Sequence, residues 1–117
     1  MNPPRRGEIY LVNLGPTIGA EIKKIRPAVI VQNDVSNQYS PITIVAAITS
    51  QINESPYPTE VILDKEQSGL HKRSAILLNQ VRSVDRPRLL KRIGKVGADT
   101  MEQVDAALMI SLALADD

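Results

Sequence analysis

The chain has 117 residues, of which 43% are hydrophobic and 23% charged, with 14 Lys and Arg against 13 Asp and Glu. This length fits a single domain over residues 1–117, and the apolar fraction can fill one core, which excludes a disordered chain. There is no cysteine, which excludes disulfides and Cys-bound metals, and no apolar run suits a signal core or a membrane helix. We therefore expect a soluble, cytoplasmic protein.

The charges are unevenly distributed along the chain. All the basic residues precede Asp99, and that part of the chain carries a net charge of +6, whereas the last nineteen residues carry −5. A basic body can present a face that attracts phosphates. The alternative is that the acidic residues only solvate the outer face of a helix.

Strand patterns dominate the first two thirds of the chain. Residues 8–14 form a mostly apolar run that Gly15 and Pro16 end. Further runs rich in β-branched or apolar residues cover 28–31, 43–49, 59–63 and 75–78. Short strands separated by Gly, Pro and Asn turns are typical of a small, curled or barrel-like sheet.

Helix signals come late in the chain. Asp85 is expected to cap a short helix over 86–91, followed by a last strand over 92–96. Asp99 and Glu102 match a capping box for a C-terminal helix. Apolar residues fall around much of that helix, which predicts packing on two sides, one against the sheet and one against a partner subunit.

Several common catalytic arrangements are excluded. Without cysteine and with His71 as the only histidine, neither Cys–His catalysis nor a two-histidine acid–base pair is possible. His71 lies in a polar, basic stretch and is expected to be a surface loop residue. The carboxylates show no clustered metal-ligand spacing and there is no phosphate-binding P-loop, so a metal-dependent nuclease is unsupported.

A chain of short motifs resembles the MazF/PemK toxin family across almost the whole sequence. They are Arg-Gly-Glu-Ile-Tyr at 6–10, Gly-Ala-Glu at 19–21, Arg-Pro-Ala-Val-Ile-Val-Gln-Asn-Asp at 26–34, Ile-Val-Ala-Ala-Ile-Thr at 44–49, Pro-Thr at 58–59, Ser-Ala-Ile-Leu-Leu-Asn-Gln-Val-Arg at 74–82, Asp85 with Arg-Leu at 88–89, and Asp-Ala-Ala-Leu at 105–108. No single motif is decisive, but together they form a strong signal.

The resemblance implies a mainly β fold, a small SH3-like barrel with a C-terminal α-helix, that forms a homodimer with an RNA groove at its interface. It also implies a toxin that cleaves single-stranded mRNA without a metal or cofactor. In that reaction the RNA 2′-hydroxyl attacks the adjacent phosphate, which leaves a 2′,3′-cyclic phosphate and a 5′-hydroxyl. The implied partner is a MazE-like antitoxin, whose acidic segment would occupy the groove.

Three residues match the catalytic positions of the family. Arg26 suits the charge that builds on the phosphorane, by positioning, charge stabilisation or proton donation, because a guanidinium does not act as a base. Glu21 is the nearby candidate base for the 2′-hydroxyl, and Thr49 could donate to a phosphate oxygen. Each has a plainer alternative: a surface arginine, a solvated loop carboxylate, and an ordinary strand threonine.

A second group matches positions that line the RNA groove in relatives. Asn33, Ser74, Asn79 and Gln80 could read base edges, or could only satisfy turns and strand ends. The basic residues Lys23, Lys24, Arg73 and Arg82 could hold phosphates, or could simply be solvated.

The sequence departs from the family at two points, and two other functions stay open. Residues 22–25 are larger than the small residues common before the Arg-Pro pair, and Asn79 replaces an acid found in many relatives, so the cleavage sequence cannot be transferred. One rival function is a non-enzymatic toxin of the same fold that poisons DNA gyrase, although the aromatic C-terminal anchor of that class is missing. The other is a catalytically inactive module that binds RNA or an antitoxin peptide.

Overall fold

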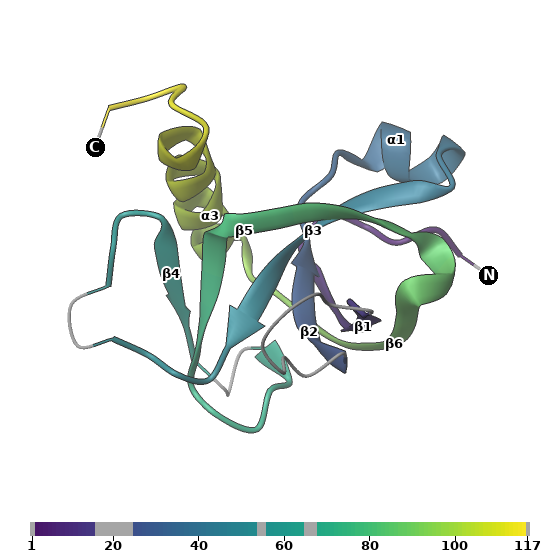
Figure 1. The fold of residues 1–117 in the computed structure, drawn as a ribbon, viewed down its shortest axis with the longest axis horizontal. Helices are drawn as coiled ribbons and strands as arrows, with labels where there is room; N and C mark the ends of the chain where they lie inside the picture. Colours follow the sequence, from purple (N-terminus) through teal and green to yellow (C-terminus); the bar gives the residue numbers. More distant parts are fainter. Residues whose placement is uncertain (1, 16–24, 54–55, 65–67, 117) are drawn as a thin grey trace.

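The computed structural model describes residues 2–15, 25–53, 56–64 and 68–116 as a six-stranded antiparallel sheet with a long C-terminal helix (Figure 1). Its strands lie in the order β4-β5-β3-β2-β1-β6. The elements are β1 (Glu8–Asn13), β2 (Ile25–Ile30), α1 (Asp34–Tyr39), β3 (Ile42–Thr49), β4 (Glu60–Leu63), β5 (Ser74–Asp85), the 3-10 helix η1 (Arg86–Arg88), β6 (Leu89–Lys95) and α3 (Ala98–Ser111).

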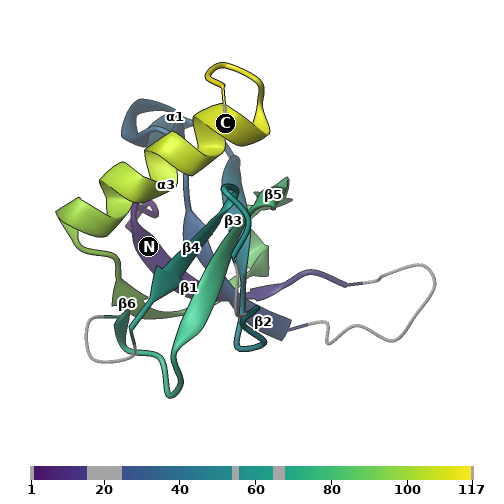
Figure 2. The same ribbon diagram turned by 90° about the vertical axis from the view of Figure 1, so that its left-hand side faces the viewer.

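The curled sheet has a core on each face. Side chains alternate between the two faces of a strand, so Val29 of β2 joins one core while Ala28 and Ile30 join the other. The larger core is covered by α3, which lies across the sheet (Figure 2) and buries Val104 and Ala107 against it. The smaller core lies on the opposite face, which is the one that carries the candidate site.

The C-terminal helix packs as expected on one side and begins two residues earlier than expected. Gly97 is the N-cap and makes no side-chain hydrogen bond, so Asp99 lies in the first turn and the predicted capping box is wrong. Met109, Leu112 and Leu114 remain exposed beyond the packed face. Among the described residues, no helix is both long and apolar enough to span a membrane.

The segment around Asp85 differs most from the sequence prediction. β5 continues to Asp85, well beyond residue 78, and η1 covers only three residues before β6 begins at Leu89. Asp85 occupies the N-cap position of η1, as predicted, but its side chain makes no capping hydrogen bond. The residues after η1 pair with β1 instead of continuing as a helix, because strand pairing outweighs local helix propensity.

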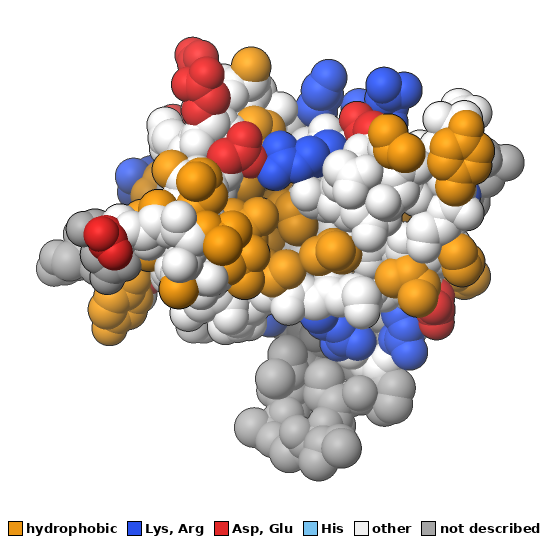
Figure 3. All heavy atoms as spheres, turned by 90° about the horizontal axis from the view of Figure 1, so that it is seen from above, with side chains coloured by type: hydrophobic (Ala, Val, Ile, Leu, Met, Phe, Trp, Pro, Cys, Tyr) orange, Lys and Arg blue, Asp and Glu red, His pale blue; other side chains and the backbone are white. Residues whose placement is uncertain are grey.

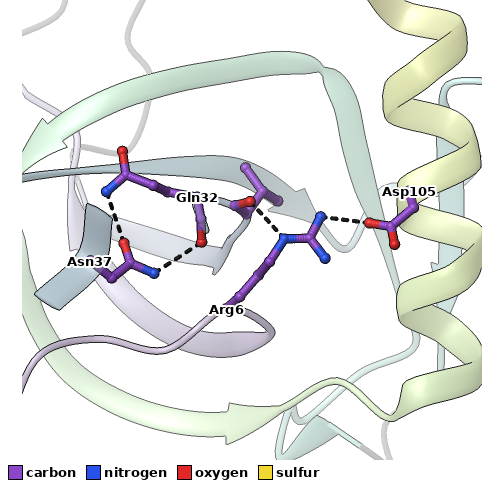
Figure 4. A network of polar contacts seen from close by, with 5 residues as sticks. Arg6, Gln32, Asn37 and Asp105 are labelled. Atoms are coloured by element: carbon purple, nitrogen blue, oxygen red, sulfur yellow. Dashed lines mark hydrogen bonds and ion pairs between the residues drawn. The ribbon is translucent and has the colours of Figure 1, made fainter. Parts of the chain in front are cut away.

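Helix α1 was not predicted, because it is held by a polar network and has no apolar stripe that would mark it in the sequence. Asn37, which is 1% exposed, donates to the Gln32 carbonyl and accepts from the Gln32 amide, at 2.9 Å in each case (Figure 4). Beside this pair, Arg6 donates to Val31 O at 2.8 Å and to Asp105 of α3 at 2.5 Å. The network ties the N-terminal segment, α1 and α3 together.

Candidate functional site

Arg26 lies at the start of β2, where the sheet brings the ends of two other strands beside it. Its register partner on β1 is Val12, and extending the Ala28–Ala47 pairing by two residues places Thr49 of β3 across from it. The Nε of Arg26 is buried and finds no hydrogen-bond acceptor among the described residues. An unpaired buried N–H is costly, so this arginine is suited to an anionic ligand.

A pocket of ≈250 Å³ opens beside Arg26. Aliphatic side chains form much of its wall, whereas two guanidinium groups and an amide supply the polar atoms. An apolar wall with a few convergent polar groups is typical of a small-molecule or nucleotide-unit site. The lining residues are Leu14, Arg26, Val45, Ala47, Gln80, Val81 and Arg82.

Thr49 ends β3 with a hydroxyl that still has a proton to donate. Its Oγ1 accepts a hydrogen bond from the Gln51 backbone amide at 3.1 Å. A threonine hydroxyl both accepts and donates, so this contact orients the oxygen and leaves its O–H available for a phosphate oxygen. The side chain is half-buried.

An irregularity in β5 brings Gln80 to the pocket. Val81 pairs with Ala46 of β3, but the next β3 residue, Ala47, pairs with Leu77. The β5 residues between Leu77 and Val81 therefore form a bulge in the pairing with β3. Such irregularities re-aim side chains and often adjoin functional sites. Gln80 lines the pocket, and Asn79 beside it is exposed.

Two arginines hold the end of β1. Arg82 donates from Nη1 to Leu14 O at 3.1 Å, and Arg88 donates from Nη1 to Asn13 O at 3.0 Å and also to Gly15 O. Charge-assisted bonds of this kind are stronger than neutral ones. Arg88 was not among the predicted site residues, because its partners are backbone carbonyls and no side-chain pattern signals them.

The other predicted site residues lie elsewhere or are used locally. Asn33 lies past the far end of β2, where its side chain caps α1 by accepting from Ser36 N at 2.8 Å. Ser74 is 4% exposed and donates to Lys72 O at 2.9 Å. Arg73 is exposed and 3.5 Å from Asp64. Three predicted site residues, Glu21, Lys23 and Lys24, lie outside the described parts of the chain.

The described part of the chain contains no group of three or more His, Asp or Glu side chains arranged to hold a metal ion. His71 is an exposed residue in the connection before β5, as the sequence indicated. The polar side chains that line the pocket are two guanidinium groups and an amide, and the Thr49 hydroxyl lies at the end of the neighbouring strand β3.

Comparison with known proteins gives one family and one fold. A family described as the PemK-like, MazF-like toxin of type II toxin–antitoxin systems matches residues 5–112. The chain is 44% identical over 112 residues to the endoribonuclease EndoA of Bacillus subtilis (strain 168), covering 96% of this chain and 97% of that protein.

The solved structures agree on the fold. An endoribonuclease from Mycobacterial species superposes with a TM-score of 0.80 at 22% identity, over 97% of this chain and 94% of that one. MazF of Deinococcus radiodurans gives 0.78 at 25% identity, over 97% and 99%. A mycobacterial endoribonuclease in complex with its cognate antitoxin gives 0.78 at 23%, over the full length of both chains. The predicted mainly β fold with a C-terminal helix is confirmed.

Proposed function

This chain belongs to the family of PemK-like, MazF-like toxins of type II toxin–antitoxin systems and is an endoribonuclease toxin of that family; from that premise, we propose that it cleaves single-stranded mRNA at short sequences without a metal ion. The observation that carries the proposal is Arg26. Its buried Nε lacks an acceptor among the described residues. Arg26 also borders a pocket, and the register places Thr49 of the neighbouring strand β3 across from it.

The proposed reaction is an internal phosphoryl transfer. The 2′-oxygen attacks the adjacent phosphorus while the bond from phosphorus to the 5′-oxygen breaks, which gives a 2′,3′-cyclic phosphate and a 5′-hydroxyl. The Arg26 guanidinium would stabilise the charge on the phosphorane, and the Thr49 hydroxyl would donate to one of its oxygens. One proton leaves the 2′-hydroxyl and one reaches the 5′-oxygen. Glu21 is the candidate base, since a guanidinium stays protonated.

Recognition of the RNA would divide between bases and backbone. Gln80 and the exposed Asn79 carry amides that can pair with base edges of single-stranded RNA. Arg82 would hold a phosphate, which positions the chain without reading its sequence. The apolar wall of the pocket is suited to the flat face of a base or to a ribose.

The direct test is cleavage of a long, unstructured RNA in excess EDTA, followed by analysis of the product ends. We expect discrete cuts with 2′,3′-cyclic phosphate and 5′-hydroxyl ends, at a rate that EDTA does not change. Cleavage that requires a divalent ion, or products with 3′-hydroxyl ends, would contradict the mechanism. A protein that binds gyrase and cleaves no RNA would revive the alternative function.

We also propose that the toxin acts in the cytoplasm as a homodimer. Hydrophobic side chains gather on one face, between the α3 and α1 sides of the molecule, with Lys and Arg near its borders (Figure 3). Leu112, at the end of α3, is 58% exposed. Leu112→Asp should weaken a dimer measured by sedimentation, whereas Leu90→Asp, at a 50% exposed site on β6, should not. A wild-type monomer at high concentration would refute the dimer.

A MazE-like antitoxin is the proposed partner. A solved MazE–MazF complex of Deinococcus radiodurans has the same fold in its toxin chain, with a TM-score of 0.75. An acidic antitoxin segment would compete with RNA for the same basic surface. The cognate antitoxin should therefore block binding of uncleavable RNA. Simultaneous binding of RNA and antitoxin would contradict competition.

A further inference from the structure

A second pocket of ≈250 Å³ adjoins the first at the end of β5. Arg82 lines both pockets. The pocket is bounded by the last part of β5, the start of β3 and η1. Its lining residues are Ile42, Arg82, Ser83, Val84, Asp85 and Arg88.

Two guanidinium groups of this pocket are held in place by backbone carbonyls. The Nη1 of Arg82 lies 3.1 Å from Leu14 O, and the Nη1 of Arg88 lies 3.0 Å from Asn13 O. A guanidinium has five N–H donors in a fixed, planar fork. Because one nitrogen of each group is anchored, the orientation of the others is set before any ligand arrives. Ser83 adds a hydroxyl donor to the same pocket.

The opposing charge in this pocket is the carboxylate of Asp85. It makes no capping bond to η1, is exposed, and has no hydrogen-bond or ion-pair partner among the described residues. Two arginines against one aspartate leave the pocket with a net positive charge. An anion with several acceptor oxygens, such as a phosphodiester, matches this set of donors.

We infer that this second pocket, formed by Arg82, Arg88 and Ser83, binds a phosphate of the RNA substrate other than the one that is cut. The inference rests on the proposed function and extends it. Gln80 in the first pocket and Ser83 in the second are separated by roughly 10 Å along an extended strand. A single RNA strand running along β5 would therefore place its reacting phosphate at Arg26 and a neighbouring phosphate at Arg88.

The substrate itself provides a test that cannot disturb the fold. After the cut sites are mapped, an oligonucleotide containing one site is made as a set, each member carrying a single uncharged methylphosphonate at a different phosphate. Outside the scissile position, we expect one position whose neutralisation lowers kcat/KM about tenfold. Equal, small effects at every flanking phosphate would overturn the inference.

Protein variants then locate that phosphate. Arg88→Ala should raise KM on the unmodified oligonucleotide about tenfold, lower the salt dependence of binding by about one phosphate contact, and remove the effect of the sensitive methylphosphonate. Asp85→Asn should act in the opposite direction and lower KM. Lys91→Ala is the control, because it removes the same charge from an exposed residue of β6 outside both pockets.

The outcomes separate this inference from the proposed function. Discrete metal-independent cleavage with equal KM values for Arg88→Ala and Lys91→Ala would refute the second pocket and leave the function intact. If Arg88→Ala lowers kcat and thermal stability but keeps the methylphosphonate effect, Arg88 acts only on the end of β1 and the inference fails. If the wild type cleaves nothing, the proposed function fails, and equilibrium binding of an unstructured RNA by the wild type, Arg88→Ala and Lys91→Ala still decides the pocket.

Discussion

At the scale of single residues, Asp34 shows how one carboxylate connects distant parts of the chain. Its Oδ1 accepts from the backbone amide of Arg6 at 2.7 Å and from Nδ2 of Asn37 at 3.3 Å. The backbone amide of Arg6 is the main cause that lowers the pKa of Asp34. Burial, the next largest effect, opposes it, and Asn37 and the charges of Arg5 and Arg6 lower the pKa further.

The lowered pKa of Asp34 predicts how its contribution depends on pH. The folded chain binds fewer protons at this site than the unfolded chain, so the stabilisation is present above the unfolded pKa and is lost as the pH falls through the folded pKa. Asp34→Asn should therefore lower the free energy of unfolding near neutrality, and the difference from wild type should shrink below about pH 4.

Urea denaturation at a series of pH values measures this difference. Asp64→Asn is the matched control, because within the described parts of the chain the Asp64 side chain forms only an exposed pair with Arg73 at 3.5 Å, and such pairs contribute little. A difference between wild type and Asp34→Asn that stays constant across the acidic range would refute the assignment.

Individual residues of the candidate site could be predicted from the sequence only where the type of side chain suggests a chemical role. Arg26, Thr49, Gln80 and Arg82 were singled out from the sequence. Arg26, Gln80 and Arg82 line one pocket, and the register of β2 and β3 places Thr49 across from Arg26. Their roles in RNA cleavage remain predictions. Asn33 and Ser74 have the right chemistry, but their side chains bond to the local backbone, and only the folded geometry distinguishes that use from RNA contact.

At the scale of elements, β6 is held against the connection before β5 by a close backbone contact. A Cβ on Gly94 would lie 1.8 Å from Ser68 O and 2.7 Å from Ser68 C. On the other side of that contact, Gly69 has a φ of +78° and a Cβ there would meet Ile93 O at 2.3 Å. These backbones can approach so closely only because neither residue has a side chain.

Gly94→Ala should consequently destabilise the protein by about 2 kcal/mol or more, since the clashing atoms are backbone. Gly97→Ala is the control, because a Cβ there has no atom within 4 Å. The free energy of unfolding of this variant should fall by less than about 1 kcal/mol. Chemical denaturation of both variants checks the prediction. Equal stabilities would mean that the contact is looser than the structure indicates.

Elements with a clear apolar period were predictable, and elements held by other forces were not. β1, β3 and α3 each coincide with an apolar run in the sequence and bury part of it. α1 depends on the buried Asn37 and its polar partners, and the second half of β5 depends on pairing with β3. Neither source of stability leaves a hydrophobic period in the sequence, so both were missed.

At the scale of the whole molecule, the site depends on the order of strands in the sheet. The Arg26 pocket takes residues from the end of β1, from β2, from β3 and from the irregular part of β5. These segments are far apart in the sequence, and the order β5-β3-β2-β1 makes them neighbours. Composition predicted a basic body, but strand order decides which basic residues meet, which is why Arg88 was not foreseen.

RNA cleavage in EDTA by Arg26→Ala beside the wild type, with Lys91→Ala as a charge-matched control, decides whether Arg26 carries the reaction. Arg26→Ala should keep its circular dichroism spectrum and lose cleavage by about 10²- to 10³-fold, as expected for removal of a group that stabilises transition-state charge. Lys91→Ala should cleave like the wild type. If Arg26→Ala makes the same cuts at the same rate, the reaction takes place elsewhere and the proposed site is wrong.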